Sequence, residues 1–138
     1  MTDGVAGPVL DASALLAYLR AEAGGHMVKA MLTARPIINA VNYAEVLTRL
    51  SDTGEEPAIV HRRLRDQGLI GDLLVVAPLD EADALAIARL RGQTRAHGLS
   101  LGDRACLATA LRLGRPVVTA DRSWAALDVG VTVHLIRP

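Results

Sequence analysis

The sequence predicts an α/β fold in which a five-stranded parallel sheet is covered by helices on both faces. Short apolar segments alternate along the chain with longer segments that have helical character. The expected strands are Val9-Leu10, Pro36–Ile38, Val75–Ala77, Val117–Thr119 and Val131–Ile136. Strands joined through helices run parallel, so their carboxyl ends meet at one edge of the sheet. Ligand sites of open α/β sheets lie at that edge.

Length and composition predict one domain, residues 1–138, with a substantial core. A hydrophobic content of 51% excludes intrinsic disorder, and no uncharged apolar run is long enough to span a membrane. The N-terminus, MTDGVAGPVLD, lacks the basic and apolar regions of a signal peptide. The single cysteine, Cys106, is predicted to be a small core residue and suits a reducing compartment. We therefore expect a cytoplasmic protein without membrane contact.

Charge gives no direct sign of a nucleic-acid surface. The chain has 15 basic and 15 acidic residues, so no global positive field is expected. A cluster of arginines in one expected helix is predicted to be a solvated face rather than an RNA contact: Arg62, Arg63 and Arg65. The few aromatic residues are predicted to lie in the core or at an interface rather than to stack on bases: Tyr18, Tyr43 and Trp124.

Helices in the first half of the chain follow recognisable caps and stops. Asp11 or Ser13 is expected to cap a helix that runs to Ala23 and stops at Gly24-Gly25. A short helix is expected over 26–34. Asn39 is expected to cap a third helix, over 40–52, where polar residues form a stripe beside the apolar face: Asn42, Glu45 and Arg49. On spacing alone, the favoured explanation of this stripe is an ordinary ion pair between Glu45 and Arg49 on a solvated face.

The second half contains two capping-box patterns. Residues 58–68 and 69–74 are expected to be helical, and Asp80 with Asp83 begins a long helix over 81–97. Ser100 and Asp103 repeat this spacing at the start of an Ala-rich helix that ends at Gly114. A short helical turn is expected to follow the fourth strand, over 121–127.

Four acids from separate parts of the chain can converge at the predicted edge: Asp11, Glu45, Asp103 and Asp121. Taken alone, Asp11 is equally explained as a helix cap. Clustered carboxylates repel one another, so a fold that gathers them needs a cation or protons. Oxygen ligands without His or Cys favour Mg²⁺ or Mn²⁺. Such ions serve in phosphodiester hydrolysis, because they activate water and stabilise the leaving oxygen.

At these residues the chain resembles the PIN-domain ribonucleases, specifically the VapC toxins of VapBC toxin–antitoxin pairs. The matching segments, in order, are VLDASALLAYL, NAVNYAEVLTRL, LSLGDRACLATAL and VVTADRSWAAL, and the resemblance runs nearly end to end. It implies a PIN-like three-layer α/β/α sandwich and a Mg²⁺- or Mn²⁺-dependent endoribonuclease. It also implies that the four acids, Asp11, Glu45, Asp103 and Asp121, are both the catalytic residues and the metal ligands.

The resemblance implies further residues and partners. Supporting roles at the site fall to Ser13, Asn42 and Thr119. The family is typically a homodimer that cleaves RNA and is neutralised by a cognate, VapB-like antitoxin. Arg104 and Arg122, each directly after a site acid, are candidates for contacts to phosphate or antitoxin, with local charge compensation as an equal alternative.

Other acidic α/β sites fit less well. A response-regulator receiver domain needs a lysine near the end of the last strand, and the only lysine is Lys29. A haloacid-dehalogenase-type phosphatase needs a second Asp where Ser13 stands, and a dinucleotide-binding domain needs GxGxxG after the first strand. The alternative that stays open is a catalytically silent PIN-like scaffold for binding or dimerisation.

Overall fold

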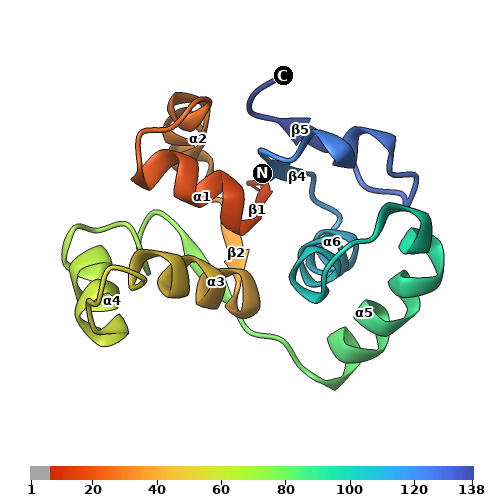
Figure 1. The fold of residues 1–138 in the computed structure, drawn as a ribbon, viewed down its shortest axis with the longest axis horizontal. Helices are drawn as coiled ribbons and strands as arrows, with labels where there is room; N and C mark the ends of the chain where they lie inside the picture. The colour runs from red at the N-terminus through yellow and green to blue at the C-terminus, as the bar shows by residue number, and fades with distance from the viewer. Residues whose placement is uncertain (1–6) are drawn as a thin grey trace, which may run out of the picture.

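A computed structural model describes residues 7–138 (Figure 1). Residues 1–6, which belong to the segment predicted not to be a signal peptide, lie outside this part. The strands are β1 (Val9–Leu10), β2 (Ile37–Asn39), β3 (Val75–Ala77), β4 (Val117–Thr119) and β5 (Val133–Leu135). The helices are α1 (Ala12–Leu19), α2 (Gly25–Met31), α3 (Ala40–Leu50), α4 (Pro57–Asp66), α5 (Glu81–Thr94) and α6 (Leu101–Leu113). Short 3-10 segments are η1 (Leu32–Ala34), η2 (Arg95–His97) and η3 (Arg122–Ala126).

All five strands are parallel, in the order β3-β2-β1-β4-β5. Val9 in the central strand β1 lies opposite Ile37 on one side and Val117 on the other. The chain builds outward from β1 to β3, then crosses back to add β4 and β5 on the opposite side. The direction of winding therefore reverses between β1 and β4, where the helices that follow the strands diverge and leave a crevice.

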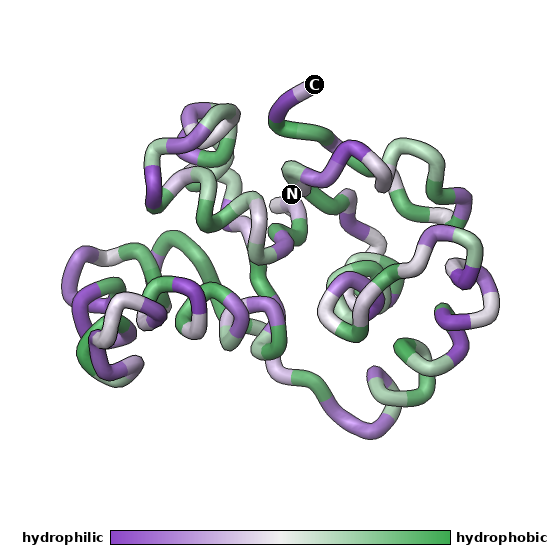
Figure 2. Tube along the Cα trace, viewed as in Figure 1, coloured by the Kyte–Doolittle hydropathy of each residue, from purple (hydrophilic) through white to green (hydrophobic). Residues whose placement is uncertain are grey.

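The sheet is buried on both faces, which confirms the predicted three-layer α/β/α architecture. Leu10 and Val118 point to one face and pack in a core with α1, α2, α3 and α4. Their neighbours Val9 and Val117 point to the other face, where they pack with α5, α6 and the fully buried Trp124. Figure 1 shows these two groups of helices on opposite sides of the strands. In Figure 2, β2 is mostly hydrophobic, whereas the outer helices α4 and α5 alternate between hydrophilic and hydrophobic turns.

The prediction of a helix over 69–74 is wrong. This segment consists of turns and an isolated bridge between Ile70 and Leu74. Gly68 and Gly71 have φ angles of 80° and 98°, in the left-handed region where a right-handed helix cannot continue.

Two other elements, α1 and β5, are shorter than predicted. Helix α1 ends at Leu19, before the positive φ of Ala21, and β5 covers only Val133–Leu135. Both differences fall at element ends, where side-chain periodicity gives the weakest signal.

Cys106, on α6, lies fully inside the core, as predicted. Burial is the largest cause that raises the pKa of its thiol well above 9.0, so the group stays protonated and unreactive at neutral pH. Within residues 7–138, every helix is too short or too polar to cross a membrane.

Candidate active site

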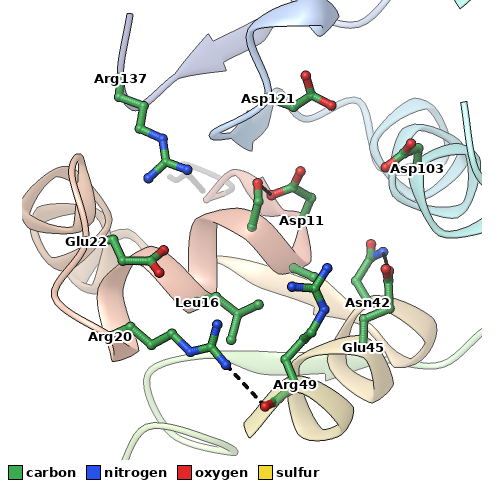
Figure 3. A pocket seen from close by; sticks show the side chains of 12 residues that line it. Asp11, Leu16, Arg20, Glu22, Asn42, Glu45, Arg49, Asp103, Asp121 and Arg137 are labelled. Atoms are coloured by element: carbon green, nitrogen blue, oxygen red, sulfur yellow. Dashed lines mark hydrogen bonds between the residues drawn. The ribbon is translucent and has the colours of Figure 1, made fainter. Parts of the chain in front are cut away.

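A cavity of about 380 Å³ opens at the carboxyl ends of β1 and β4 and is lined by all four predicted acids (Figure 3). Asp11 directly follows β1, and Asp121 comes two residues after the end of β4. Glu45 projects from α3, and Asp103 lies in the first turn of α6. The fold thus brings together four residues that are spread over more than a hundred positions of sequence.

Asp11 is buried and held by a network of hydroxyl and backbone groups. Its Oδ1 accepts hydrogen bonds from Ser13 Oγ, at 2.7 Å, and from the backbone N–H of Ala14, at 2.8 Å. Its Oδ2 accepts a hydrogen bond from Thr119 Oγ1, across from β4. Asp11 is therefore both the cap of α1 and a fixed carboxylate at the floor of the cavity.

The same hydroxyl groups tie Asp11 to the loop that carries Asp121. The backbone N–H of Ala120 donates to Ser13 Oγ at 2.9 Å, and that of Asp121 donates to Thr119 Oγ1 at 3.0 Å. These contacts join the ends of β1 and β4. They run through Ser13 and Thr119, whose supporting role at the site stays a prediction.

Burial raises the pKa of Asp11 from 3.8 to about 6, and is the largest contribution. The hydrogen bonds from Thr119, Ser13 and Ala14 favour the charged form and limit this rise, while the charge of Asp103 adds to it. A carboxyl group with this balance holds its proton more readily than an exposed one. A nearby cation would stabilise its ionised form and so lower its pKa.

Glu45 is oriented by Asn42 and by close contact with α6. Asn42 Nδ2 donates to Glu45 Oε1 at 2.8 Å and to the carbonyl oxygen of Gly102 at 3.0 Å. A Cβ atom at Gly102 would lie only 2.4 Å from Glu45 Oε1. The missing side chain at Gly102 is therefore what lets the Glu45 carboxylate reach the first turn of α6, next to Asp103.

Asp103 and Asp121 are each held through one carboxylate oxygen. Asp103 Oδ2 accepts from the backbone N–H of Ser100 at 3.0 Å, completing a capping box with the Ser100 hydroxyl. Asp121 Oδ1 accepts from the backbone N–H and the hydroxyl of Ser123, at 3.0 and 2.7 Å. In both residues, the second oxygen accepts no hydrogen bond from the part of the chain that the structure describes.

The lining of the cavity suits a hard divalent cation. Carboxylates dominate its ligand groups, and no His or Cys of the described chain lines it. Among residues 7–138, however, no three His, Cys, Asp or Glu side chains are grouped so that they could hold a metal ion as they stand. Carboxylate oxygens still fit Mg²⁺ or Mn²⁺, because these ions retain several water ligands and bind through few protein oxygens.

One of the two predicted arginine contacts is wrong. Arg104 is buried, and its guanidinium donates to the carbonyl oxygen of Ile87 in α5 at 2.9 Å. It therefore links α6 to α5 inside the core rather than facing phosphate, antitoxin or the neighbouring acid. Arg122 is exposed, and its contact to phosphate or antitoxin stays a prediction.

Sequence reasoning missed a second group of charged residues around the same cavity. Three arginines and a glutamate line it together with the acids: Arg20, Glu22, Arg49 and Arg137. Of these four, the sequence singles out Arg49 alone, as a possible ion-pair partner of Glu45. Among residues 7–138 no such ion pair is formed. The others follow the ends of α1 and β5 and carry no pattern that marks them in the sequence.

A PIN-domain family model matches residues 9–130, so the chain belongs to the PIN-domain family. A comparison with curated protein sequences finds no match.

Several solved structures share this fold over almost their whole length. FitAcB from Neisseria gonorrhoeae superposes with a TM-score of 0.71 and 22% identity, covering 93% of this chain and 96% of its own. A DNA-bound VapBC complex from Salmonella typhimurium gives a TM-score of 0.70 at 15% identity, over 95% of this chain and 98% of its own. VapC20 from Mycobacterium tuberculosis, a toxin that cleaves the sarcin–ricin loop, gives 0.66 at 14% identity, over 91% and 99%. At these identities the likeness is one of fold.

Proposed function

We propose that this PIN-domain protein is a Mg²⁺- or Mn²⁺-dependent endoribonuclease that acts as the toxin of a VapBC-type pair. The observation that carries the proposal is the convergence of Asp11, Glu45, Asp103 and Asp121 on one cavity at the carboxyl edge of the sheet. PIN domains are generally nucleases, and one structural neighbour, VapC20, is a toxin that cleaves an RNA loop. The substrate class we assign is therefore RNA.

The four carboxylates are the residues that would hold the divalent cation. When bound, the cation supplies activated water and neutralises the negative charge that develops on the phosphate. Asp103 and Asp121 each present an oxygen that accepts no hydrogen bond from residues 7–138. Asp11 contributes a buried carboxylate whose charge a cation would stabilise.

The remaining polar groups would act by fixing these carboxylates. Ser13 and Thr119 restrict both oxygens of Asp11, and Asn42 fixes Glu45 Oε1. Such preorganisation lowers the reorganisation needed when charge develops during phosphodiester cleavage. Ser13, Asn42 and Thr119 are therefore positioning residues in this proposal.

The partners we propose follow the VapBC pattern. Structural neighbours include toxin–antitoxin complexes from Klebsiella pneumoniae and Salmonella typhimurium. We assign this chain a cognate VapB-like antitoxin, a homodimeric assembly and a cytoplasmic location.

The test is cleavage of a cellular RNA pool by the purified protein in Mn²⁺, Mg²⁺ or EDTA, with sequencing of the product ends. Wild type is compared with Asp103→Asn, which removes the charge while its side-chain oxygen can still accept from the Ser100 N–H. We expect metal-dependent cuts by wild type and a loss of at least about 100-fold in the variant, because one ligand charge is removed.

The matched control is Asp83→Asn. Asp83 occupies the same capping-box position in α5 but does not line the cavity, so this variant should cleave like wild type. Unaltered cleavage by Asp103→Asn would contradict the site assignment. No cleavage by wild type with either ion, together with no growth arrest on expression, would favour the silent scaffold instead.

A further inference from the structure

Three arginines also line the cavity, and the proposed hydrolysis does not explain them. Arg20 follows the end of α1, Arg49 lies in the last turn of α3, and Arg137 follows β5. In Figure 3, Arg20 and Arg137 lie on the side away from Asp103 and Asp121, with Glu22 between them. Arg49 lies between Arg20 and the neighbouring side chains of Asn42 and Glu45. Three segments distant in sequence therefore bring guanidinium groups to one cavity, and these three arginines form its basic wall.

Two of these guanidinium groups are held by backbone carbonyl oxygens. Arg20 Nη2 donates to the carbonyl of Arg49 at 3.1 Å, and Arg137 Nη1 donates to the carbonyl of Ala23 at 3.1 Å. A guanidinium has five N–H donors, so each keeps further donors for a ligand. The carbonyl contacts restrict the long side chains and reduce the entropy lost when a ligand binds.

Among residues 7–138, no ion pair neutralises the charges of the three arginines. Glu45 and Arg49 have the spacing of a helical ion pair, yet Asn42 holds the Glu45 carboxylate toward α6 instead. Glu22 also lines the cavity, but no ion pair joins it to any arginine among residues 7–138. The wall thus keeps a net positive charge next to the acids.

We propose that Arg20, Arg49 and Arg137 bind a backbone phosphate of single-stranded RNA that flanks the phosphodiester held at the acids. This proposal rests on the proposed function, because it takes the acidic half as the place of cleavage. Guanidinium groups match phosphate oxygens through paired N–H donors, and several of them around one pocket suit an anion. An RNA strand that crosses the cavity would then meet acids at one phosphate and arginines at the next.

The proposal locates an RNA contact in a chain whose net charge is zero. The other exposed arginine cluster, on α4, lies outside the cavity, and its Arg63 pairs with Glu55. Arg62 on the same helix is exposed and serves as a matched control, because it carries the same charge at a distance from the site.

The test measures binding of a short fluorescently labelled single-stranded RNA by anisotropy, in EDTA and over a range of salt concentrations. EDTA prevents metal-dependent cleavage, and every protein in the set keeps the same four acids, so their repulsion of RNA cancels in the comparison. We expect the triple variant Arg20→Gln, Arg49→Gln, Arg137→Gln to bind about tenfold or more weakly than wild type. Its plot of log K against log salt should be shallower by about 0.7, the contribution of one phosphate contact on a single strand.

Arg62→Gln should bind RNA like wild type. Glu22→Gln should bind more tightly, because it removes the one acid from the basic wall. The proposal is overturned if wild type binds no RNA, if the triple variant keeps the wild-type affinity and salt slope, or if Arg62→Gln loses as much as the triple variant. A protein that binds RNA through these arginines yet cuts none with Mn²⁺ would overturn the proposed hydrolysis and leave the RNA contact standing.

Discussion

Burial of the Asp11 carboxylate at the site lowers the stability of the fold when this group is ionised. Its side chain is buried, and its two oxygens accept three hydrogen bonds that favour the ionised form. Burial nevertheless dominates and raises its pKa to about 6. In the absence of a cation, the ionised carboxylate therefore opposes folding.

Replacing Asp11 by Asn should change how stability depends on pH. The unfolded chain ionises Asp11 near pH 3.8 and the folded chain near pH 6, so wild type loses stability as pH rises through this window. A rise of this size corresponds to at most about 3 kcal/mol. In EDTA, we expect the unfolding free energy of wild type, relative to Asp11→Asn, to fall by up to that amount between about pH 3.5 and pH 7.

The measurement is urea unfolding followed by fluorescence of the single, buried Trp124. Using the variant as reference removes the contribution of the titrating groups that do not interact with Asp11, because those groups titrate alike in both proteins. A difference in unfolding free energy that stays constant from pH 3.5 to pH 7 would contradict a buried Asp11 with a raised pKa.

At the scale of elements, helices α3 and α6 come into close contact at Gly102. Helix α3 approaches the first turn of α6 closely enough for the Glu45 carboxylate to occupy the space of a side chain at Gly102. The Asn42 side chain bridges the same two helices. The contact between α3 and α6 is therefore built around the position of Glu45.

Gly102→Ala should separate function from stability. The new Cβ would displace the end of the Glu45 side chain, which can rotate away, so the helix itself should tolerate the change within about 1 kcal/mol. Cleavage of RNA should fall roughly 10- to 100-fold, because a ligand is moved from its place. Melting temperature and cleavage rate, measured on the same preparation, report the two effects.

Gly92→Ala is the matched control for this substitution. Nothing lies within 4 Å of a Cβ at Gly92, inside α5, so the variant should cleave like wild type and gain about 0.5–1 kcal/mol in stability. If Gly102→Ala cleaved RNA at the wild-type rate, the position of Glu45 against α6 would have no part in catalysis.

Local signals in the sequence predicted the elements better than their ends. The capping boxes of α5 and α6 and the apolar strands β3 and β4 lie where the sequence predicts them. The segment 69–74 was misassigned because its apolar residues fit helix and turn alike, and only the positive φ angles of Gly68 and Gly71 decide between them.

The positions of three arginines depend on tertiary structure and could not be predicted from the sequence: Arg20, Arg104 and Arg137. Arg104 follows a site acid in sequence, but a helix turns successive side chains about 100° apart, so it points into the core instead. Arg20 and Arg137 meet at the cavity only because α1 and the end of β5 lie near each other in the folded chain. Motif spacing carries no information about such pairs.

At the scale of the whole molecule, the order of the strands creates the site. Because winding reverses between β1 and β4, the carboxyl ends of these neighbours are followed by segments that leave in different directions. Asp11 and Asp121 come from those two ends, and α3 and α6 add Glu45 and Asp103 from either side of the sheet. The four predicted acids therefore line one cavity.

The most direct test of this account is a titration of the RNA-free protein with Mn²⁺, followed by electron paramagnetic resonance or calorimetry. Wild type should bind the ion, Asp103→Asn should bind at least about tenfold more weakly because one ligand charge is lost, and Asp83→Asn should match wild type. Equal affinity in wild type and Asp103→Asn, or no binding by wild type, would contradict the claim that these carboxylates form a divalent-cation site.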